Sequence, residues 1–246
     1  MSNEDKYQEI AEFYDAMLPP NAIRGDFFKK HFQRYRVKRV LDCACGTGND
    51  LLLFHELGYS VCGSDLSEAM LEVAKRKLQQ NNIQVPLQQV DFHNLKQHYS
   101  LRFGAIVCLS NAINEFEVDA CKALRSMRSI LTPGGIIIFD QGQTDFSMKN
   151  PPQFMPIVNS KDISRLFVMD YARSIMTVQA FDFIHKERDK KYDFRRSEFK
   201  IRIRLLADWK EILDALEMQA EYYGDWDSAI YDITKSNRLI VIARKN

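Results

Sequence analysis

At 246 residues, the chain is long enough to form one substantial domain with a sizeable hydrophobic core. Its 46% hydrophobic and 27% charged residues are ordinary for a globular protein, and the net charge of +1 argues against a dedicated nucleic-acid-binding protein. No apolar run approaches the length of a membrane span, and the polar, acidic residues 1–5 do not resemble a signal peptide. We therefore expect a cytoplasmic protein with no membrane partner.

The N-terminal segment is predicted to be helical over residues 4–36, with a break at Pro19–Pro20, and residues 1–36 are expected to form a lid. After the break, phenylalanines recur at helical spacing among basic residues. The basic residues invite an RNA-binding interpretation. The neutral overall charge and the interleaved phenylalanines favour instead the solvated face of an amphipathic helix.

A strand near residues 38–43 carries Asp42 and leads into a loop of small residues that contains Gly46 and Gly48. A helix is expected over residues 50–57, capped at its start by Asn49 or Asp50 and ended by Gly58. The two glycines allow a ligand to approach the backbone closely. A dinucleotide fingerprint would need a third glycine where Leu51 stands, and Asp42 would repel a pyrophosphate. A carboxylate beside loop carbonyls favours a cationic ligand.

Strands and helices then alternate as far as residue 140. The expected strands are 60–64, one ending near 89–92, 105–109 and 136–140, the last after a turn at 133–135. The expected helices are one capped by Ser67 and one over residues 117–131. This alternation predicts a parallel sheet covered on both faces, and residues 37–140 are expected to form the core of the domain.

The pattern changes after residue 140. Polar and apolar residues alternate in strands expected at 166–169, 175–183 and 199–204, with a charged turn at 186–191. We expect residues 141–204 to form an antiparallel platform inserted beside the main sheet. A helix at 207–217 and strands near 219–224 and 238–244 are expected to close the domain over residues 205–246.

The five cysteines, at positions 43, 45, 62, 108 and 121, are odd in number and lie in segments prone to burial. This usage predicts reduced thiols in a cytoplasmic protein. Cys43 and Cys45 could form half of a metal site, but no second pair has ligand spacing. We therefore expect small core residues and no metal.

Four segments resemble the motifs of class I S-adenosylmethionine-dependent methyltransferases. The first runs from Asp42 to Gly48, with Ala44 in place of the motif's first glycine, and is similar to the variant in glycine N-methyltransferases and their small-molecule relatives. Residues 63–71, 90–92 and 109–114 resemble the second, third and fourth motifs. The resemblance implies an α/β fold with a Rossmann-like, seven-stranded, mostly parallel sheet, and S-adenosyl-L-methionine as cofactor.

The resemblance also implies a set of site residues. Asp65 would accept the ribose hydroxyls, Asp91 the adenine amino group, and Phe92 would provide a backbone donor and an apolar wall. Tyr14 resembles a lid tyrosine, and Asn111 is the polar group of the fourth motif, so both are the catalytic candidates. The full set of cofactor-binding candidates is Asp42, Ala44, Cys45, Gly46, Gly48, Asp65, Leu66, Met70, Asp91, Phe92, Leu109 and Arg24, the last pairing with the cofactor carboxylate.

The implied reaction is in-line methyl transfer to a small-molecule acceptor, at nitrogen rather than oxygen. Such a displacement requires orientation and exclusion of water, and neither a protein nucleophile nor a metal. One departure from the resembling family argues against glycine as the acceptor. In glycine N-methyltransferases an arginine after the fifth strand binds the substrate carboxylate, whereas residues 140–149 of this chain contain no arginine. Lys149 or a platform arginine would have to replace it. The alternatives are an RNA or protein methyltransferase and a non-catalytic cofactor-binding regulatory module. Monomer and homodimer both remain open.

Overall fold

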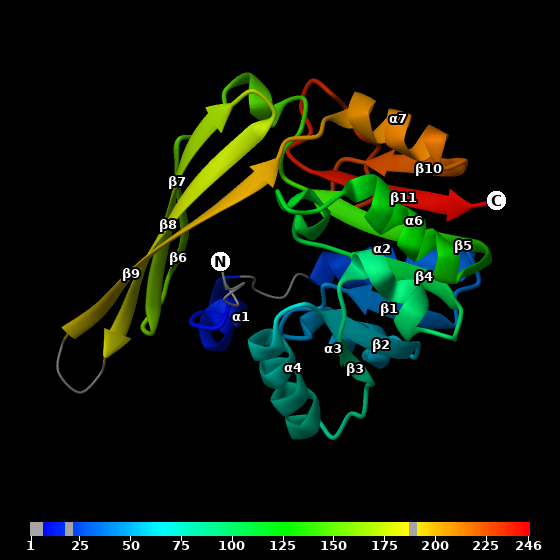
Figure 1. Cartoon of the computed structure of the whole chain (residues 1–246), viewed down its shortest axis with the longest axis horizontal. Helices are drawn as coiled ribbons and strands as arrows, with labels where there is room; N and C mark the ends of the chain where they lie inside the picture. Colours follow the sequence, from blue (N-terminus) through cyan, green and yellow to red (C-terminus); the bar gives the residue numbers. More distant parts are fainter. Residues whose placement is uncertain (1–6, 18–21, 187–190) are drawn as a thin grey trace.

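Seven strands form the main sheet, and the predicted mostly parallel α/β architecture is confirmed (Figure 1). The computed structural model describes residues 7–17, 22–186 and 191–246. The strands pair in the order β10-β11-β5-β4-β1-β2-β3, and β11 alone runs in the opposite direction, antiparallel to both β5 and β10. Their bounds are β1 (Arg39–Cys43), β2 (Ser60–Asp65), β3 (Leu87–Gln89), β4 (Phe103–Cys108), β5 (Leu131–Gln141), β10 (Met218–Tyr223) and β11 (Leu239–Lys245).

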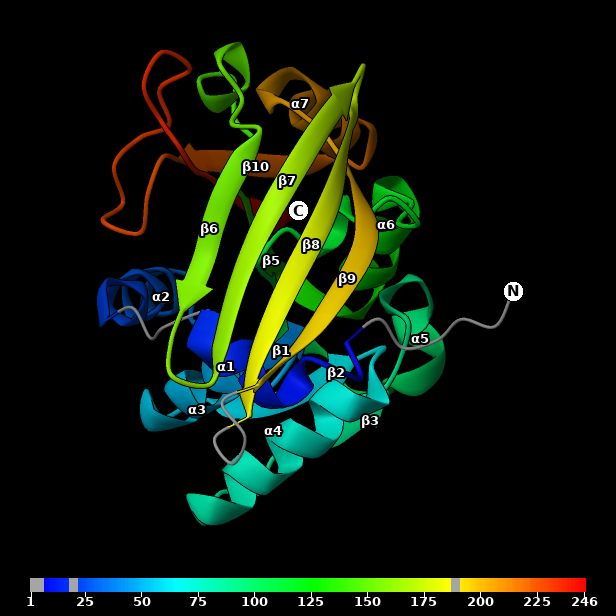
Figure 2. The same ribbon diagram turned by 90° about the vertical axis from the view of Figure 1, so that its left-hand side faces the viewer.

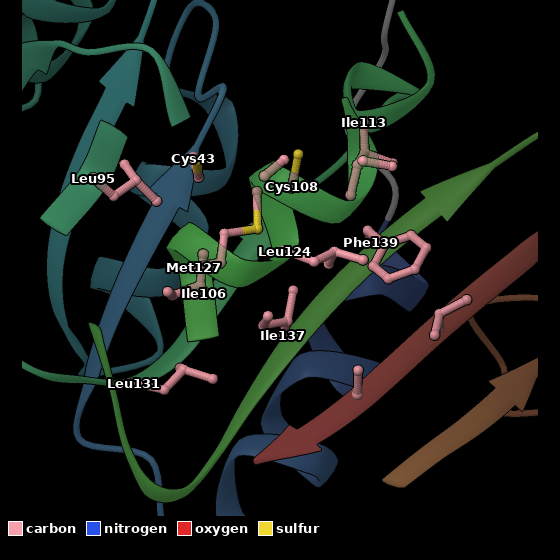
Figure 3. Close-up of a cluster of buried hydrophobic side chains, with 14 of the residues drawn as sticks. Cys43, Leu95, Ile106, Cys108, Ile113, Leu124, Met127, Leu131, Ile137 and Phe139 are labelled. Atoms are coloured by element: carbon pink, nitrogen blue, oxygen red, sulfur yellow. The ribbon is translucent and has the colours of Figure 1, made fainter. Parts of the chain in front are cut away.

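Helices cover both faces of this sheet because successive strand residues point to opposite sides. On one face, Val40 and Val107 pack with α2 (Ala22–Arg34), α3 (Asn49–Glu56) and α4 (Glu68–Gln80). On the other, strand residues pack with α5 (Leu95–His98), α6 (Ala120–Ile130) and α7 (Leu206–Ala215). Figure 3 shows this second cluster, with Ile106 and Ile137 of the sheet beside Met127 of α6.

The helix α2 belongs to the core. Phe27, Phe28 and Phe32 are buried against the sheet, whereas Lys29 and Lys30 are exposed. The predicted amphipathic helix with a solvated basic face is therefore confirmed. Only the short 3-10 helix η1 (Ala11–Phe13) and helix α1 (Tyr14–Met17) precede it among the described residues, and the expected break at Pro19–Pro20 lies outside them.

A separate four-stranded antiparallel sheet, which we call the platform, stands beside the main sheet (Figure 2). Its strands are β6 (Phe154–Asn159), β7 (Ile163–Ala172), β8 (Ile175–Lys186) and β9 (Lys191–Arg202). The sequence predicts shorter versions of the last three and misses β6. That strand lies at the edge of the platform, where a residue without a backbone N–H, such as Pro156, is tolerated. Of the charged turn, residues 187–190 lie outside the described residues.

The platform faces the carboxyl ends of the parallel strands, with α1 between the two sheets (Figures 1 and 2). Ile163 of β7 and Ile184 of β8 form a small buried cluster with Ile10 and Met17. The N-terminal segment is therefore held against the platform by apolar contacts. It lies over the edge of the main sheet where parallel α/β folds bind ligands.

Local details correct four sequence predictions. Asn49 and Asp50 do not cap α3, because Gly48 occupies the N-cap position without a side-chain bond. Helix α6 begins at Ala120, where Asp119 caps it, and not at residue 117. The turn expected at residues 133–135 lies within β5, where Gly134 has a φ of +71°. The thiol of Cys121 is exposed, whereas the other four cysteines are buried.

Two end signals are confirmed. The Ser67 hydroxyl oxygen accepts the Met70 N–H at 3.1 Å and caps α4. Gly58 follows the end of α3 with a φ of +86°, in the left-handed region that glycine adopts readily. Both signals act within one turn of chain, so local sequence specifies them.

Candidate functional site

A cavity of about 1820 Å³ opens at the carboxyl ends of β1, β2 and β4 and extends to the platform. It is larger than a typical small-molecule pocket of roughly 300–1,000 Å³, and so has room for two ligands side by side. Twelve of the residues predicted from the sequence line it: Tyr14, Arg24, Asp42, Ala44, Cys45, Gly46, Asp65, Leu66, Met70, Asp91, Phe92 and Leu109. Gly48 and Asn111 are not among the lining residues.

Asp42 is the polar group in this cavity with the clearest need for a ligand. Its side chain is buried at the end of β1, and its Oδ2 atom has no hydrogen-bond partner among the described residues. Burial raises the pKa of Asp42, the nearby Asp50 and Asp65 raise it further, and Arg24 opposes them. A buried carboxylate oxygen without a partner is costly, and a bound hydrogen-bond donor or cation would remove that cost.

Asp65 organises the glycine loop from the end of β2. Its Oδ2 accepts the Gly46 N–H at 2.8 Å, and its Oδ1 accepts the Ser67 N–H at 2.9 Å. These bonds tie the first loop to the start of α4. The carboxylate therefore has a structural role in addition to its place in the cavity wall, which the sequence does not predict.

The loop itself has an unusual backbone. Gly46 and Gly48 have φ values of +52° and +82°, and Ala44 has a φ of +72°, in the region that favours glycine. Ala44 thus occupies a left-handed position at which the resembling motif has glycine. A Cβ on Gly48 would lie 3.1 Å from the Ala74 Cβ, so this glycine permits close packing of the loop on α4. Gly48 therefore has a packing role, and Gly46 is the glycine that lines the cavity.

Apolar and acidic side chains of residues 66–70 and 91–92 form one wall of the cavity. Leu66 is 60% exposed although it is a large apolar residue, and Met70 and Phe92 lie along the same wall. Asp91 begins the 3-10 helix η2 (Phe92–Asn94), where its Oδ1 accepts the His93 N–H at 2.8 Å. This wall suits a flat apolar ligand with polar edges.

Helix α1 forms the roof over the glycine loop. Tyr14 lines the cavity, and a Cβ on Gly46 would lie 3.9 Å from its Cε1 atom. Burial, with the nearby Asp65 and Glu115, raises the pKa of Tyr14 to about 12, so its hydroxyl remains a donor at neutral pH.

Asp15, beside Tyr14, anchors α1 to the loop. It accepts hydrogen bonds from the Thr47 hydroxyl at 2.5 Å and from Asn49 Nδ2 at 3.0 Å, and Lys77 Nζ lies 2.6 Å from its Oδ2. Burial would raise the pKa of Asp15, but the bonds from Lys77 and Thr47 outweigh it and the pKa is lowered. Thr47 and Asn49 therefore hold the roof in place.

Arg24 reaches the cavity from α2 and contacts both carboxylate oxygens of Asp50 at 2.7 Å. Its guanidinium also lies 5.1 Å from the Trp226 ring centroid. The ion pair explains why Asp50 does not cap α3. It also places the positive group next to Asp42, at the end of the cavity near the loop.

Asn111 does not reach the cavity. Its Oδ1 accepts the Gly142 N–H at 3.2 Å, and the preceding Ser110 donates its N–H to Asp140 Oδ1 at 2.7 Å. Both residues have positive φ values, +65° and +58°, so the chain turns sharply after β4. Bonds to the end of β5 hold this turn, and Ser110 lines the cavity in place of Asn111.

Sequence reasoning misses the residues at the platform end. Tyr7, Glu115, Phe116 and Phe199 line the cavity there. The Tyr7 hydroxyl donates to Glu115 Oε1 at 2.8 Å. No motif marks these residues, because Glu115, Phe116 and Phe199 meet only when the segment after the 3-10 helix η3 (Ala112–Asn114) pairs with β9, and Tyr7 joins them from the N-terminal segment.

The described residues contain no group of three or more His, Cys, Asp or Glu side chains placed to hold a metal ion. In the same part of the chain, no helix is long and apolar enough to cross a membrane.

The sheet order, the glycine loop and the cavity at the carboxyl ends of β1 and β2 define the fold of class I S-adenosylmethionine-dependent methyltransferases. Residues 40–135 match the model of a family described as methyltransferase domain. Over these residues the chain is therefore similar to methyltransferase domains.

Curated relatives share the region of the motifs. A glycine/sarcosine N-methyltransferase of Aphanothece halophytica is 33% identical over 143 residues, which cover 57% of this chain and 52% of the relative. A glycine N-methyltransferase of Rattus norvegicus is 27% identical over 156 residues, which cover 57% and 52%. The chain thus spans about half the length of the curated relatives it matches.

Solved structures match nearly the whole chain. An S-adenosylmethionine-dependent methyltransferase from Clostridium acetobutylicum ATCC 824 has a TM-score of 0.84 at 18% identity, covering 98% of this chain and 99% of that one. The sugar N-methyltransferase KedS8 from Streptoalloteichus sp ATCC 53650 has a TM-score of 0.76 at 20% identity, covering 96% and 92%. At these identities the likeness establishes the fold, including the platform.

Proposed function

We propose that this protein binds S-adenosyl-L-methionine and transfers its methyl group to a nitrogen atom of a small-molecule acceptor. The observation that carries the proposal is the buried Oδ2 of Asp42, which has no partner in the described part of the chain and lies in a cavity formed by a glycine loop at the carboxyl edge of the sheet. An ammonium group is the ligand chemistry that satisfies this oxygen, because it provides both charge and donors.

The other lining residues fit the same cofactor. Asp42 and Arg24 would hold its amino-acid end, and Asp65 would accept the ribose hydroxyls. Leu66, Met70 and Phe92 would enclose the adenine, with Asp91 at its amino group. When bound, the cofactor supplies a methyl group on a positively charged sulfur, with a neutral leaving group.

The chain's own residues then have to orient the acceptor and exclude water, which are the main requirements of such a displacement. Tyr14 covers the glycine loop from α1, and its hydroxyl is a donor at neutral pH. Of the two catalytic candidates, Tyr14 is the one that lines the cavity, and we assign it the catalytic role. Asn111 is assigned a positioning role, because it holds the turn after β4 through Gly142.

The charge of the cavity supports an amine acceptor. Eleven acidic residues line it, against three lysines and arginines. The acidic set is Asp42, Asp50, Glu56, Asp65, Glu68, Glu72, Asp91, Glu115, Glu117, Asp119 and Glu198, and the basic set is Arg24, Lys122 and Lys200. Methylation of an amine places positive charge on nitrogen, which carboxylates stabilise. The same charge disfavours RNA, whose phosphates an acidic wall repels.

The names of similar proteins agree with nitrogen as the target. Those proteins are described as glycine/sarcosine and sugar N-methyltransferases. Because the chain spans about half of the curated relatives, and because the structural identities are low, the acceptor is inferred from the cavity and not carried over from them.

Calorimetric titration of the purified chain with S-adenosyl-L-methionine and with NAD tests the cofactor assignment. We expect micromolar affinity for the first and none for the second. Millimolar or weaker affinity for S-adenosyl-L-methionine beside tight NAD binding would contradict it.

Release of S-adenosylhomocysteine in the presence of amines tests the reaction. Transfer to tRNA or protein but to no metabolite would favour the other enzyme class, and tight binding without turnover on any acceptor would favour a regulatory module.

A further inference from the structure

The platform end of the cavity is built from two segments that are fastened together. The Phe116 N–H donates to the Lys200 carbonyl at 2.9 Å, and Glu115 forms a backbone bridge with Ile201. This pairing sets the half-buried Glu115 carboxylate and the Phe116 and Phe199 side chains around one end of the cavity. An acceptor held beside the glycine loop would reach this end, because the loop and these residues line the same cavity.

The charged groups at this end are mostly acidic. Glu115, Glu117, Asp119 and Glu198 line it, and the cations of the same wall are Lys122 and Lys200. Both lysines are exposed, whereas Glu115 is half-buried and accepts the Tyr7 hydroxyl. The interior therefore presents a carboxylate, and the lysines lie at the rim next to acidic residues.

The arginines that could grip a substrate carboxylate have other partners. Arg165 of β7 forms a buried ion pair with Asp182, with N···O distances of 2.6 and 2.9 Å. Arg195 pairs with the Glu9 carboxylate at 3.3 Å. Breaking a buried pair such as Arg165 and Asp182 would leave a charge unpaired in the interior, at a cost of several kcal/mol.

Two further arginines, close to the end of β9, donate hydrogen bonds to other parts of the chain. Arg202 Nε donates to the Phe116 carbonyl at 3.1 Å, and Arg204 Nη1 donates to Asn114 Oδ1 at 2.8 Å. Lys149, the other candidate from the sequence, is exposed on the 3-10 helix η4 (Ser147–Lys149) and is not among the lining residues. Among the described residues, neither Lys149 nor any arginine of the platform therefore lines the cavity.

We propose that the acceptor is an amine that carries no carboxylate group, with its nitrogen directed to Glu115. This inference rests on the proposed function and names its substrate class. In the reaction, the nitrogen lone pair forms the new N–CH₃ bond while the S–CH₃ bond breaks and its electron pair stays on sulfur. The positive charge moves to nitrogen beside an acidic wall, and the ammonium then loses its proton to water. A substrate carboxylate at this end would face the half-buried Glu115, whereas Lys122 and Lys200 lie exposed at the rim.

The test compares matched acceptors with and without the carboxylate, with rates referred to the concentration of each unprotonated amine because an amide also lowers the pKa of the neighbouring amine. Glycine is paired with glycinamide and sarcosine with sarcosinamide, with ethanolamine and glucosamine as further carboxylate-free amines. Release of S-adenosylhomocysteine by the full chain is measured for each. We expect turnover of carboxylate-free amines, with kcat/KM for each amide at least about tenfold above that of its acid, as expected when one charged contact is unfavourable. Equal or better use of glycine or sarcosine would overturn the inference and leave the proposed function in place.

Substitution of Glu115 provides an independent test of the inference. Glu115→Gln is expected to lower kcat/KM for the preferred amine by about ten- to a hundredfold, the loss typical of one charged hydrogen bond, with unchanged affinity for S-adenosyl-L-methionine. Glu211→Gln, on the exposed side of α7, is the matched control. Unchanged kcat/KM in Glu115→Gln, or a glycine activity that Lys200→Met abolishes, would overturn the inference. Tight cofactor binding without transfer to any amine would instead overturn the proposed function, and this inference with it.

Discussion

Asp65 combines two tasks in one carboxylate. It accepts backbone N–H groups from Gly46 and Ser67, and it lines the cavity where the ribose is proposed to bind. Hydrogen bonds to a charged group each contribute roughly 1.5–3 kcal/mol. A change at this residue therefore acts on the loop and on the ligand together.

We predict that Asp65→Ala weakens binding of S-adenosyl-L-methionine by on the order of a hundredfold and also lowers the free energy of unfolding, by about 1–3 kcal/mol. The second effect follows from the two backbone donors that lose their acceptor. Calorimetric titration and urea denaturation measure the two effects on the same sample. Unchanged affinity in a folded Asp65→Ala protein would remove Asp65 from the proposed cofactor site.

His31 is a buried group that the proposed reaction does not use. Its ring is fully buried between Phe27 and Tyr223, with centroid distances of 4.4 and 5.0 Å, and neither ring nitrogen has a hydrogen-bond partner within the described ranges. Burial, with the charges of Lys30 and Arg34, lowers the pKa of His31 to about 4, and Glu221 opposes the shift. The folded protein therefore favours the neutral ring.

This lowered pKa predicts acid sensitivity. The unfolded chain binds a proton at about pH 6.5 and the folded chain at about pH 4, so stability falls as the pH drops through this window and is unaffected by His31 above it. We expect wild type to lose about 2 kcal/mol more than His31→Phe between pH 7.5 and 4.5, since each tenfold difference in proton affinity corresponds to about 1.4 kcal/mol. Urea denaturation at both pH values measures the difference. Parallel losses in the two proteins would show that His31 does not titrate in this way.

At the scale of elements, α1 is too short to be stable alone, since isolated helices need roughly 12–15 residues. It is held by the platform through Met17 and by the glycine loop through Asp15. The second attachment involves the loop that the proposed cofactor contacts. Cofactor retention should therefore depend on Asp15.

We predict that Asp15→Ala raises the dissociation constant of S-adenosylhomocysteine by about tenfold, because the roof carrying Tyr14 loses its bonds to Thr47 and Lys77. Glu12→Ala is the matched control, since Glu12 pairs only with the exposed Arg76 on α4 among the described contacts. Titration of both variants checks the expectation. An equal loss in the two would point to a general effect of charge and not to the roof.

The elements that the sequence predicts well are those specified within a few residues. The loop glycines, the Ser67 cap and Gly58 act on their own turn of chain, so they can be recognised without tertiary information. The predicted caps Asn49 and Asp50 fail for the opposite reason. Their side chains are bound by Asp15, Lys77 and Arg24, which come from other elements.

The residues of the candidate site are likewise predicted where nearby sequence specifies them and missed where distant segments place them. Ten of the twelve predicted residues that line the cavity belong to motifs at strand ends, whose position in a parallel sheet is fixed by topology, and the other two, Tyr14 and Arg24, come from helices α1 and α2. Asn111 is predicted to face the cavity, but the turn after β4 directs its amide oxygen to Gly142. Glu115 and Phe199 could not be predicted, because a long-range strand pairing brings them together.

At the scale of the whole molecule, a buried polar network joins the platform to the main sheet. Gln141, at the end of β5, accepts from Asn114 Nδ2 at 2.7 Å and from Trp209 Nε1 at 2.8 Å. Its own amide donates to the Arg204 carbonyl at 2.6 Å and to the Gln143 carbonyl. Every polar atom of this side chain is therefore used, and the network spans η3, β5, α7 and the segment after β9.

We predict that Gln141→Leu lowers the free energy of unfolding by several kcal/mol, because about 1–3 kcal/mol is lost for each buried group left without a partner. Trp209→Phe, which removes one donor and keeps an aromatic ring, should cost about 1–2 kcal/mol. Because the network fixes the platform relative to the main sheet, and the proposed cofactor contacts lie at the edge of the main sheet, Gln141→Leu should raise KM for the acceptor more than Kd for S-adenosyl-L-methionine. Denaturation together with acceptor and cofactor titrations separates the effects. A parallel rise in both constants would mean that the network supports the whole cavity and not the platform end alone.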